Sequence, residues 1–369
     1  MLLNPDYSQT PSAGGKVPNM TRTLKFFQAI NEATDQCMAK DPSVLLIGLG
    51  VPDPRGIFGT TLGLVEKYGA ARVMDMPLSE NGMTGVAIGA ALRGMRPVIT
   101  HQRIDFALLS LEQIVNQAAN WHYMFAGQYC MPLVIRMIVG RGWGQGPQHS
   151  QSLQAWFAHV PGLKVVMPTT PYDAKGLLVA AIEDNNPVIF IEHRWLHNIH
   201  GEVPQDVYRV PLGKARVLRE GRDVTIVSVS YMTLEAIRAA EMLAAEGISA
   251  EVVDVRTLRP FDAETILASV RKTGRLVAAE LAWKSLSFSA EVVATVAEGA
   301  MDRLHCPPRR VCLPDCPTPT SPALAAHYYP RAVHLAATVR QMMGRGDQLQ
   351  AAEASVPLDI PDKSFTGPF

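Results

Sequence analysis

Cysteine is scarce in this sequence, with five in 369 residues, and its spacing defines no site. Structural zinc sites usually hold two closely spaced pairs of ligands, and no two such pairs occur here. Three of the cysteines fall in the segment 305–317, which contains four prolines and only one imidazole, His305. We therefore expect reduced thiols and no metal in this segment. The five residues are Cys37, Cys130, Cys306, Cys312 and Cys316.

Net charge and long apolar runs are also missing. Lysine plus arginine equal aspartate plus glutamate at 34 each, so no electrostatic surface for nucleic acid or an anionic membrane is expected. Apolar stretches stop short of the ~20 residues that a membrane helix needs, as where Arg136 interrupts PLVIRMIV. The first twenty residues hold polar residues, proline and glycine where a signal peptide needs a continuous apolar run. We expect a cytoplasmic protein whose partners are small molecules and other proteins.

Apolar residues make up 47% of the sequence, and their pattern alternates between two periods. Short apolar runs bounded by turn residues precede longer segments of helical period, which is typical of parallel βαβ units. Both halves of the chain show this alternation, and the chain is too long for one ordinary core. The predicted fold class is therefore α/β, with two domains that each contain a mostly parallel sheet flanked by helices. The predicted segments are a flexible arm over 1–21, a first domain over 22–200, a second domain over 201–343 and a tail over 344–369.

The same alternation locates individual elements. In the first half we expect strands at Val44–Gly48, Arg96–Thr100, Leu133–Val139, Lys164–Met167 and Val188–Glu192, and helices at Thr23–Ala39, Gly82–Arg93, Leu111–Phe125 and Pro171–Glu183. The polar, proline-containing stretch His197–Asp206 is the predicted linker. In the second half we expect strands at Val224–Val229, Glu251–Val255, Leu276–Glu280 and Arg310–Leu313, and helices at Leu234–Glu246, Asp262–Lys272, Phe288–Gly299 and Arg331–Met343.

One carboxylate, Glu80, stands at the start of a helix rich in glycine and alanine, in the segment MPLSENGMTGVAIGAALRG that begins at Met76. Ligands bind at the carboxyl ends of parallel strands, so a carboxylate just before a helix is placed to meet one. The alternative is a glutamate of the first helical turn that is stabilised only by the helix dipole, an effect of ~0.3–1 kcal/mol. The local pattern alone leaves both interpretations open.

A run of four spaced glycines follows the strand expected at Leu133–Val139. It lacks the Gly-Lys-Ser/Thr of a phosphate loop, and no helix holds its third glycine, so it matches neither nucleotide motif. We predict a flexible active-site loop that carries His149 toward a cleft, where imidazole could act as an acid or a base. A loop histidine without a role is the alternative. The four glycines are Gly140, Gly142, Gly144 and Gly146.

An aromatic residue, Phe106, stands in the segment HQRIDFALLSLEQIV, where Arg103 and Asp105 precede an apolar helix. An aromatic side chain at such an edge could stack on a planar ring. Core phenylalanine is the commoner explanation, and the segment by itself does not decide between the two.

Taken together, these segments resemble the beta subunits of pyruvate, branched-chain 2-oxoacid and acetoin dehydrogenases over roughly residues 22–343. The first half resembles the pyrimidine-binding domain of transketolase-like enzymes, and the second half resembles their C-terminal domain. The matching segments are PLSENGMTGVAIGAA, LEQIVNQAA, GPQHSQSLQAWFAHVPGLKVVMPTTPYDAKGLLVAAIEDNNPVIFIEH, GKARVLREGRDVTIVSVS and GISAEVVDVRTLRPFD.

The resemblance implies thiamine diphosphate as cofactor and gives roles to three residues. Glu80 would hydrogen-bond the pyrimidine N1′ and favour the imino tautomer that removes the C2 proton. Phe106 would pack against the aminopyrimidine. His149 would lie near the centre where the acyl group is transferred. A structural K⁺ ion is also implied, at Met131, Leu133, Val134, Ala181, Asp184 and Asn186.

The sequence lacks the motif that binds Mg²⁺ in this family, so we expect the active site to be formed by two chains. The family binds the cofactor diphosphate through Mg²⁺ held by a Gly-Asp-Gly segment, and no such segment occurs here. The Mg²⁺ ligands should therefore belong to an alpha-type subunit, in a heterotetramer of two alpha and two beta chains. The segment Gly48-Leu49-Gly50 lacks the usual acidic residue, which puts communication between the active sites in doubt. Two other departures indicate a specialised relative: HQRIDF replaces a more apolar segment, and the tail after Met343 is longer than usual.

The leading functional hypothesis is decarboxylation of a small 2-oxoacid with transfer of the acyl unit to the lipoyl group of a partner acyltransferase. One alternative is a two-subunit carboligase or transketolase-like enzyme of specialised carbohydrate metabolism. Another is a non-catalytic assembly scaffold, against which the joint presence of Glu80, Phe106 and His149 argues. The sequence does not identify the 2-oxoacid, because selectivity in such pockets depends on contacts of only ~1–3 kcal/mol.

Overall fold

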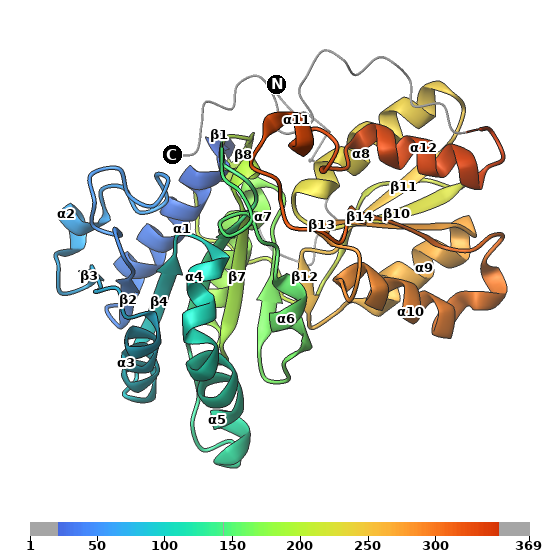
Figure 1. Cartoon of the computed structure of the whole chain (residues 1–369). Helices are drawn as coiled ribbons and strands as arrows, with labels where there is room; N and C mark the ends of the chain where they lie inside the picture. The colour runs from blue at the N-terminus through green and yellow to red at the C-terminus, as the bar shows by residue number, and fades with distance from the viewer. Residues whose placement is uncertain (1–20, 143, 347–369) are drawn as a thin grey trace.

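The computed structural model describes residues 21–142 and 144–346, in which two sheets lie side by side (Figure 1). The first sheet has seven strands, and only the β12–β6 pair is antiparallel. Its spatial order is β12 (Thr257–Arg259), β6 (Lys164–Val166), β7 (Val188–His193), β5 (Val134–Val139), β4 (Arg96–His101), β2 (Val44–Ile47) and β3 (Val73–Met74). The central strands β5 and β7 are buried along their whole length, as expected for parallel strands covered on both faces.

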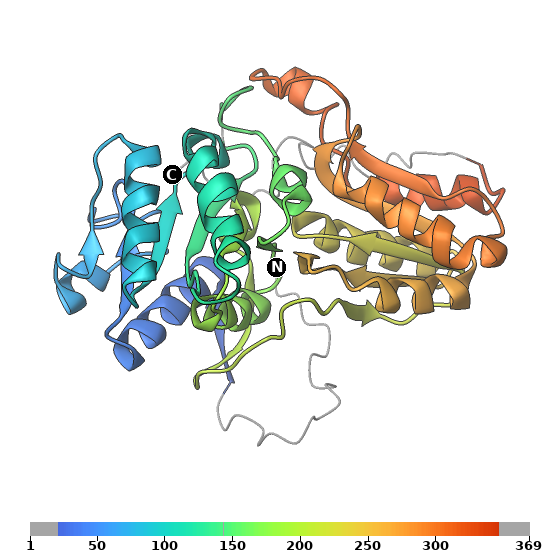
Figure 2. The ribbon, with the colours of Figure 1, turned by 90° about the horizontal axis from the view of Figure 1, so that it is seen from below.

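Helices cover both faces of this sheet (Figure 2). Helices α1 and α7 pack together on one face, and α3 and α5 lie on the other. Helix α7 begins where the sequence pattern placed it, because Pro171 occupies its first turn and the Thr170 hydroxyl accepts a hydrogen bond from the Asp173 backbone N–H at 3.0 Å. The elements are α1 (Phe26–Lys40), α2 (Leu64–Tyr68), α3 (Glu80–Leu92), α4 (Ile104–Ala107), α5 (Ala119–Met124), α6 (Gln154–His159), α7 (Pro171–Glu183), the 3₁₀ turns Leu108–Ser110 and Arg194–Leu196, and the π-helix Gln113–Ala118.

Three predicted elements differ from the structure. The helix expected from Thr23 begins at Phe26, because the residues before it form strand β1 (Thr21–Lys25). This strand pairs antiparallel with β8 (His200–Pro204), which lies inside the stretch predicted as a linker. The single helix expected over Leu111–Phe125 contains a π-helical turn before α5. Long-range pairing and a changed helical period are both invisible to local periodicity.

The second sheet has five strands, in the order β14 (Arg309–Leu313), β13 (Leu276–Trp283), β10 (Val224–Ser228), β11 (Ala250–Asp254) and β9 (Arg216–Arg219). Strand β9 pairs antiparallel with β11, and the other pairs are parallel. The two mostly parallel sheets confirm the predicted fold class. Helices α8 and α12 pack together on one face, and α9 and α10 pack together on the other. Their bounds are α8 (Tyr231–Ala245), α9 (Ala263–Thr273), α10 (Phe288–Ala300), α11 (Pro322–Ala325) and α12 (Ala332–Met342), with a 3₁₀ turn at Met301–Arg303.

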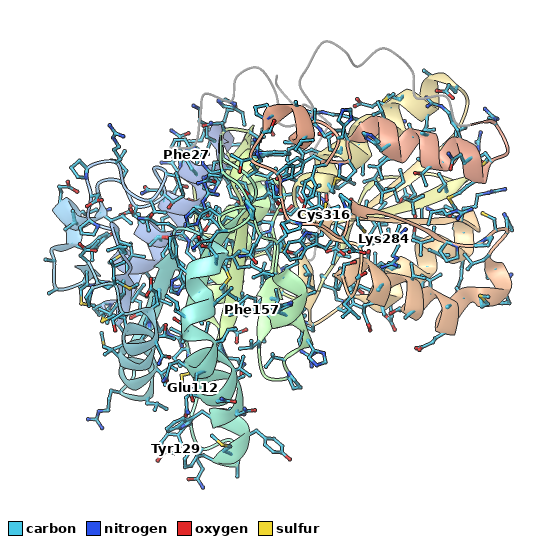
Figure 3. All side chains as sticks on the ribbon, in the orientation of Figure 1. Phe27, Glu112, Tyr129, Phe157, Lys284 and Cys316 are labelled. Carbon is cyan, nitrogen blue, oxygen red and sulfur yellow. The ribbon has the colours of Figure 1, made fainter. Side chains whose placement is uncertain are left out.

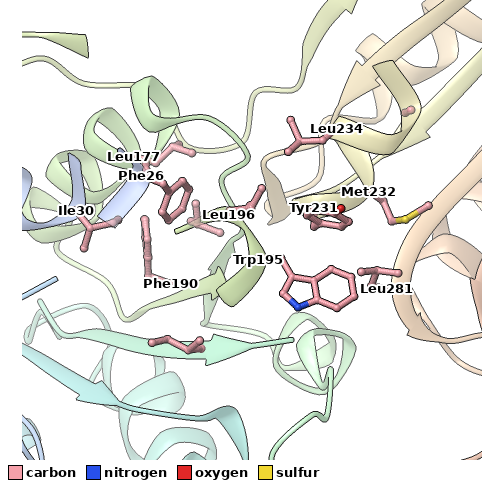
Figure 4. Packing of buried hydrophobic residues seen from close by; sticks show 14 of the residues in the cluster. Phe26, Ile30, Leu177, Phe190, Trp195, Leu196, Tyr231, Met232, Leu234 and Leu281 are labelled. Atoms are coloured by element: carbon pink, nitrogen blue, oxygen red, sulfur yellow. The ribbon is translucent and has the colours of Figure 1, made fainter. Parts of the chain in front are cut away.

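The apolar core continues from one sheet to the other (Figure 4). Trp195, which follows β7, packs against Tyr231 and Tyr329 of the second domain at ring-centroid distances of 5.0 and 4.9 Å. The second half also contributes β12 to the sheet of the first, so the two domains share both a sheet and a core. Within the described part of the chain, no helix is long and apolar enough to cross a membrane. The predicted arm over 1–21 and tail over 344–369 lie outside the described residues, except for residues 21 and 344–346.

Candidate active site

The predicted site residues gather at the carboxyl edge of the first sheet. Glu80 begins α3, the helix after β3, and Phe106 lies in α4, directly after β4. His149 lies in the loop after β5. The three strands run in the same direction, so the segments that follow them meet at one edge of the sheet. The Thr84 hydroxyl donates to Ser110 Oγ at 2.9 Å and ties α3 to the turn after α4.

Glu80 is 6% exposed, although it is a carboxylate. Among the residues that the structure describes, none donates a hydrogen bond to its side chain, and the helix-capping residue Ser79 makes no side-chain cap. The first turn of α3 provides the positive end of a helix dipole, which favours a negative charge but leaves the carboxylate oxygens as available acceptors. The Glu80 oxygens are not among the fully buried side-chain atoms without a partner, so they keep some contact with solvent. They can accept a hydrogen bond from a ligand or from another chain.

His149 is held by a carboxylate that sequence reasoning had not selected. The Asp105 side chain is 4% exposed, and its Oδ2 lies 2.9 Å from His149 Nδ1. An ionised carboxylate can only accept, so Nδ1–H donates and Nε2 is left as the basic nitrogen of the neutral ring. Phe106 completes the group, with its ring centroid 5.4 Å from that of His149. The signal was present in the sequence, because Asp105 directly precedes Phe106 in HQRIDF.

The glycine loop that leads to His149 is anchored at several points. Gly140 has φ 92°, and a Cβ on it would lie 2.5 Å from the His193 ring, so only glycine fits there. Arg103 Nη1 donates to the Gly140 carbonyl at 2.8 Å, and Arg141 Nη2 donates to the Thr320 carbonyl of the second domain at 2.8 Å. The loop that we predicted to be flexible is thus tied to both domains by hydrogen bonds.

Buried charged and titratable groups lie beneath this edge. Arg136, which interrupts an apolar run in the sequence, forms an ion pair with Glu192 in which both side chains are 0% exposed. Burial would raise the pKa of Glu192, but Arg136 and His197 hold it below its ordinary value. Burial lowers the pKa of His193 to about 3 and that of His101 to about 4, so both rings are neutral at physiological pH.

The residues implied for K⁺ come from two segments that lie together. The Met131 N–H donates to the Asn185 carbonyl at 2.9 Å, which joins the entry of β5 to the turn after α7. Two cationic side chains already contact this group: Arg96 Nη1 donates to the Asp184 carbonyl at 3.0 Å, and Lys164 pairs with the Asp184 carboxylate. The ion therefore stays a prediction, at a place where positive charge is already supplied.

Comparison with known proteins follows the same two-part division. Residues 22–198 match the transketolase pyrimidine-binding domain, and residues 213–335 match the transketolase C-terminal domain. Among solved structures, the chain is similar to one described as split gene transketolase, inactive beta4 tetramer, with a TM-score of 0.73 at 25% identity over 88% of this chain and 100% of that one. The fold and the site thus define a transketolase-like protein.

Two curated relatives narrow the class. The chain is 46% identical to the acetoin:2,6-dichlorophenolindophenol oxidoreductase subunit beta of Cupriavidus necator, over 89% of this chain and 99% of the relative. It is 42% identical to the mitochondrial pyruvate dehydrogenase E1 component subunit beta-2 of Oryza sativa, over 86% of this chain and 85% of the relative. The chain belongs to this family of 2-oxoacid dehydrogenase beta subunits, as the sequence resemblance had indicated.

Proposed function

We propose that the chain is the beta subunit of a thiamine-diphosphate-dependent 2-oxoacid dehydrogenase and supplies the pyrimidine side of its active site. The observation that carries the proposal is the buried carboxylate of Glu80, which lacks a described donor and lies at the same sheet edge as Phe106 and His149. The family of beta subunits to which the chain belongs supports the same reading.

The residues present fit the cofactor. When bound, thiamine diphosphate supplies an acidic carbon, C2, that acts as the nucleophile toward a carbonyl group. Glu80 would accept the hydrogen bond of the protonated pyrimidine nitrogen, which satisfies its free acceptor oxygens. Phe106 is half-buried and offers an aromatic face for the aminopyrimidine.

His149 is proposed to act in acid–base catalysis during acyl transfer. Its side chain is 39% exposed, which lets it meet an incoming acceptor. Asp105 fixes the ring and leaves Nε2 to take or give a proton. Asp105 is therefore a positioning residue that acts through His149.

The diphosphate half of the site is assigned to an alpha-type partner in a heterotetramer of two alpha and two beta chains. This chain has no Gly-Asp-Gly segment to hold Mg²⁺. It does expose large apolar side chains around α3 and α5, and clustered exposed apolar residues favour a protein interface. Figure 3 shows Tyr129 at the end of the projection beyond α5. The exposed residues are Leu78, Val86, Leu109, Tyr123, Met124, Phe125 and Tyr129.

Titration calorimetry with thiamine diphosphate and Mg²⁺ tests this division. The chain alone should show no micromolar binding, and mixing with the alpha-type chain should restore it. The similar split transketolase is described as an inactive beta tetramer, which agrees with a beta chain that needs its partner. Micromolar binding by the isolated chain would overturn the divided site.

The carboligase or transketolase-like alternative is favoured by one observation, the charged segment with Arg103 and Asp105 at the site. Product analysis separates the two functions. The dehydrogenase should pass the acyl unit to a lipoyl group of a partner acyltransferase, whereas a carboligase should join it to an aldehyde or ketone. We place the enzyme in the cytoplasm, which cell fractionation would test.

A further inference from the structure

Arg103 is a buried cation at the edge of the candidate active site. The residue is 3% exposed and directly precedes α4, which carries Asp105 and Phe106. Its Nη1 donates to the Gly140 carbonyl at 2.8 Å, so it also contacts the loop that leads to His149. Burial, with the neighbouring charge of Arg194, lowers the pKa of Arg103 to about 10, and the side chain stays charged at neutral pH.

The charge of Arg103 is offset only in part, by the attraction of the nearby Asp105 carboxylate. No carboxylate of the described residues lies within ion-pair distance of it, and its Nη2 is a buried donor with no hydrogen-bond partner among them. The centroid of the Phe58 ring lies 5.4 Å from the guanidinium carbon of Arg103 and 4.7 Å from that of Arg194. Such contacts stabilise a cation by only about 0.5–2 kcal/mol, less than the cost of a buried unpaired charge. An anion is therefore the missing partner.

The chemistry of decarboxylation excludes one anion as the partner of Arg103, namely the carboxylate that leaves as CO₂. A cation on the carboxylate that is lost as CO₂ would stabilise the substrate more than the transition state, because the negative charge leaves that group as the bond breaks. Such an interaction would slow decarboxylation. A negative group elsewhere on the substrate keeps its charge throughout and can be bound without this penalty.

We propose that Arg103 Nη2 binds a second carboxylate on the substrate, so that the enzyme prefers 2-oxo dicarboxylic acids over 2-oxoacids with an apolar end. The inference deepens the proposed function and rests on it. Gly142 lies beside this donor: a Cβ there would lie 2.7 Å from Gln145 Oε1 and 3.2 Å from Arg103 Nη2, so glycine leaves room next to both groups.

The test compares 2-oxoglutarate with 2-oxovalerate, which have the same five-carbon chain and differ in a terminal carboxylate or methyl group. Dissociation constants are measured by calorimetry on the assembled enzyme, without turnover. The unmodified enzyme should bind 2-oxoglutarate more tightly. Arg103→Met should weaken the binding of 2-oxoglutarate about 10- to 100-fold, the range of a hydrogen bond to a charged group. It should change the dissociation constant of 2-oxovalerate less than about twofold.

Three further variants separate recognition from structure. Arg103→Lys keeps the charge and should retain the preference in part. Gly142→Ala crowds Gln145 Oε1 as well as Nη2, and should weaken binding of 2-oxoglutarate more than binding of 2-oxovalerate. Arg72→Met is the matched control, since Arg72 also donates to backbone carbonyls, including that of Val44 at 2.9 Å; it should leave the preference unchanged.

Two results would overturn the inference. If the unmodified enzyme bound both acids with equal affinity, it would not recognise a second carboxylate. If Arg103→Met lost the same amount of affinity for both acids, Arg103 would be assigned to anchoring the loop or the partner chain. Failure of the proposed function looks different, because the assembled enzyme would then decarboxylate neither acid whatever their relative affinities.

Discussion

The two sheets are built from the same kind of parallel strands, but the buried carboxylates of the two domains differ in their hydrogen bonds. In the first domain, Glu80 accepts no hydrogen bond from a described residue, and Arg103 has a buried donor, Nη2, without a described partner. In the second, Glu280 is also buried, but it accepts hydrogen bonds from Gln154 Nε2 at 3.0 Å and from the Ser289 backbone N–H. The two domains share one kind of fold, yet one buried carboxylate accepts hydrogen bonds from a side chain and a backbone N–H, whereas the other accepts none from a described residue. The fold alone therefore does not decide how a buried carboxylate is held.

The largest effect is expected at the edge of the first sheet, from Glu80→Gln in the assembled enzyme. Glutamine keeps the shape of the side chain but cannot share a proton with the pyrimidine nitrogen, so turnover should fall by about 10²–10⁴-fold. Hydrogen–deuterium exchange at C2 of the bound cofactor measures the step directly.

The control for Glu80→Gln is its folding. Thermal unfolding, subunit assembly and cofactor affinity should stay near those of the unmodified enzyme, since loss of a helix-dipole contact costs only ~0.3–1 kcal/mol. If C2 exchange also continues at the unmodified rate, Glu80 is only a helix-terminal glutamate and the central proposal fails.

The edge of the second sheet should respond through the stability of the fold. Asp254, at the end of β11, is fully buried, and burial together with the charge of Asp173 raises its pKa to about 7. The folded state therefore holds the proton more tightly than the unfolded state. The stability from this group is present below about pH 4 and is lost as pH rises through about 7, a change on the order of 4 kcal/mol at most.

Asp254→Asn isolates that contribution, because asparagine resembles the protonated acid. We expect denaturant unfolding of the variant to vary less between about pH 5 and 8, and the variant to be the more stable protein at about pH 8. An unchanged pH dependence would mean that Asp254 does not titrate in this range. Asp223→Asn, at a partly exposed site, is the matched control.

A smaller effect on turnover is expected from Asp105→Asn. The amide can still contact His149, but it does not fix the Nδ1–H tautomer as a carboxylate does, so acyl transfer should slow by about 10–100-fold. His149→Ala should slow the same step at least as much. Both variants should leave C2 exchange unaffected, and an equal loss in that assay would contradict a role restricted to acyl transfer.

The smallest effect is expected from potassium. If K⁺ binds between the Met131 and Asp184 segments, the melting temperature should be slightly higher in KCl than in NaCl at equal ionic strength, by the linkage of ligand binding to stability. The shift should be small because Arg96 and Lys164 already contact this group. Identical melting curves would remove the ion from the proposal.

Much of the fold was readable from local pattern. The buried runs that became β5 and β7, and the proline-led start of α7, follow rules that act over a few residues. The pairing of β1 with β8 could not be read in this way, because it joins residues almost 180 positions apart. In the site, Glu80, Phe106 and His149 came from resemblance and residue type, whereas the partnership of Asp105 with His149 depends on how the segments after two different strands meet.

Strand β12 has a consequence for how this protein can be divided. It belongs to the second half of the chain but closes the edge of the first sheet beside β6, while β8 ties the connecting segment back to β1. A fragment cut after residue 200 would expose the unpaired edge of β6, and exposed edges invite aggregation. We therefore expect the two halves to fold together, and we do not expect either half to fold as a separate domain.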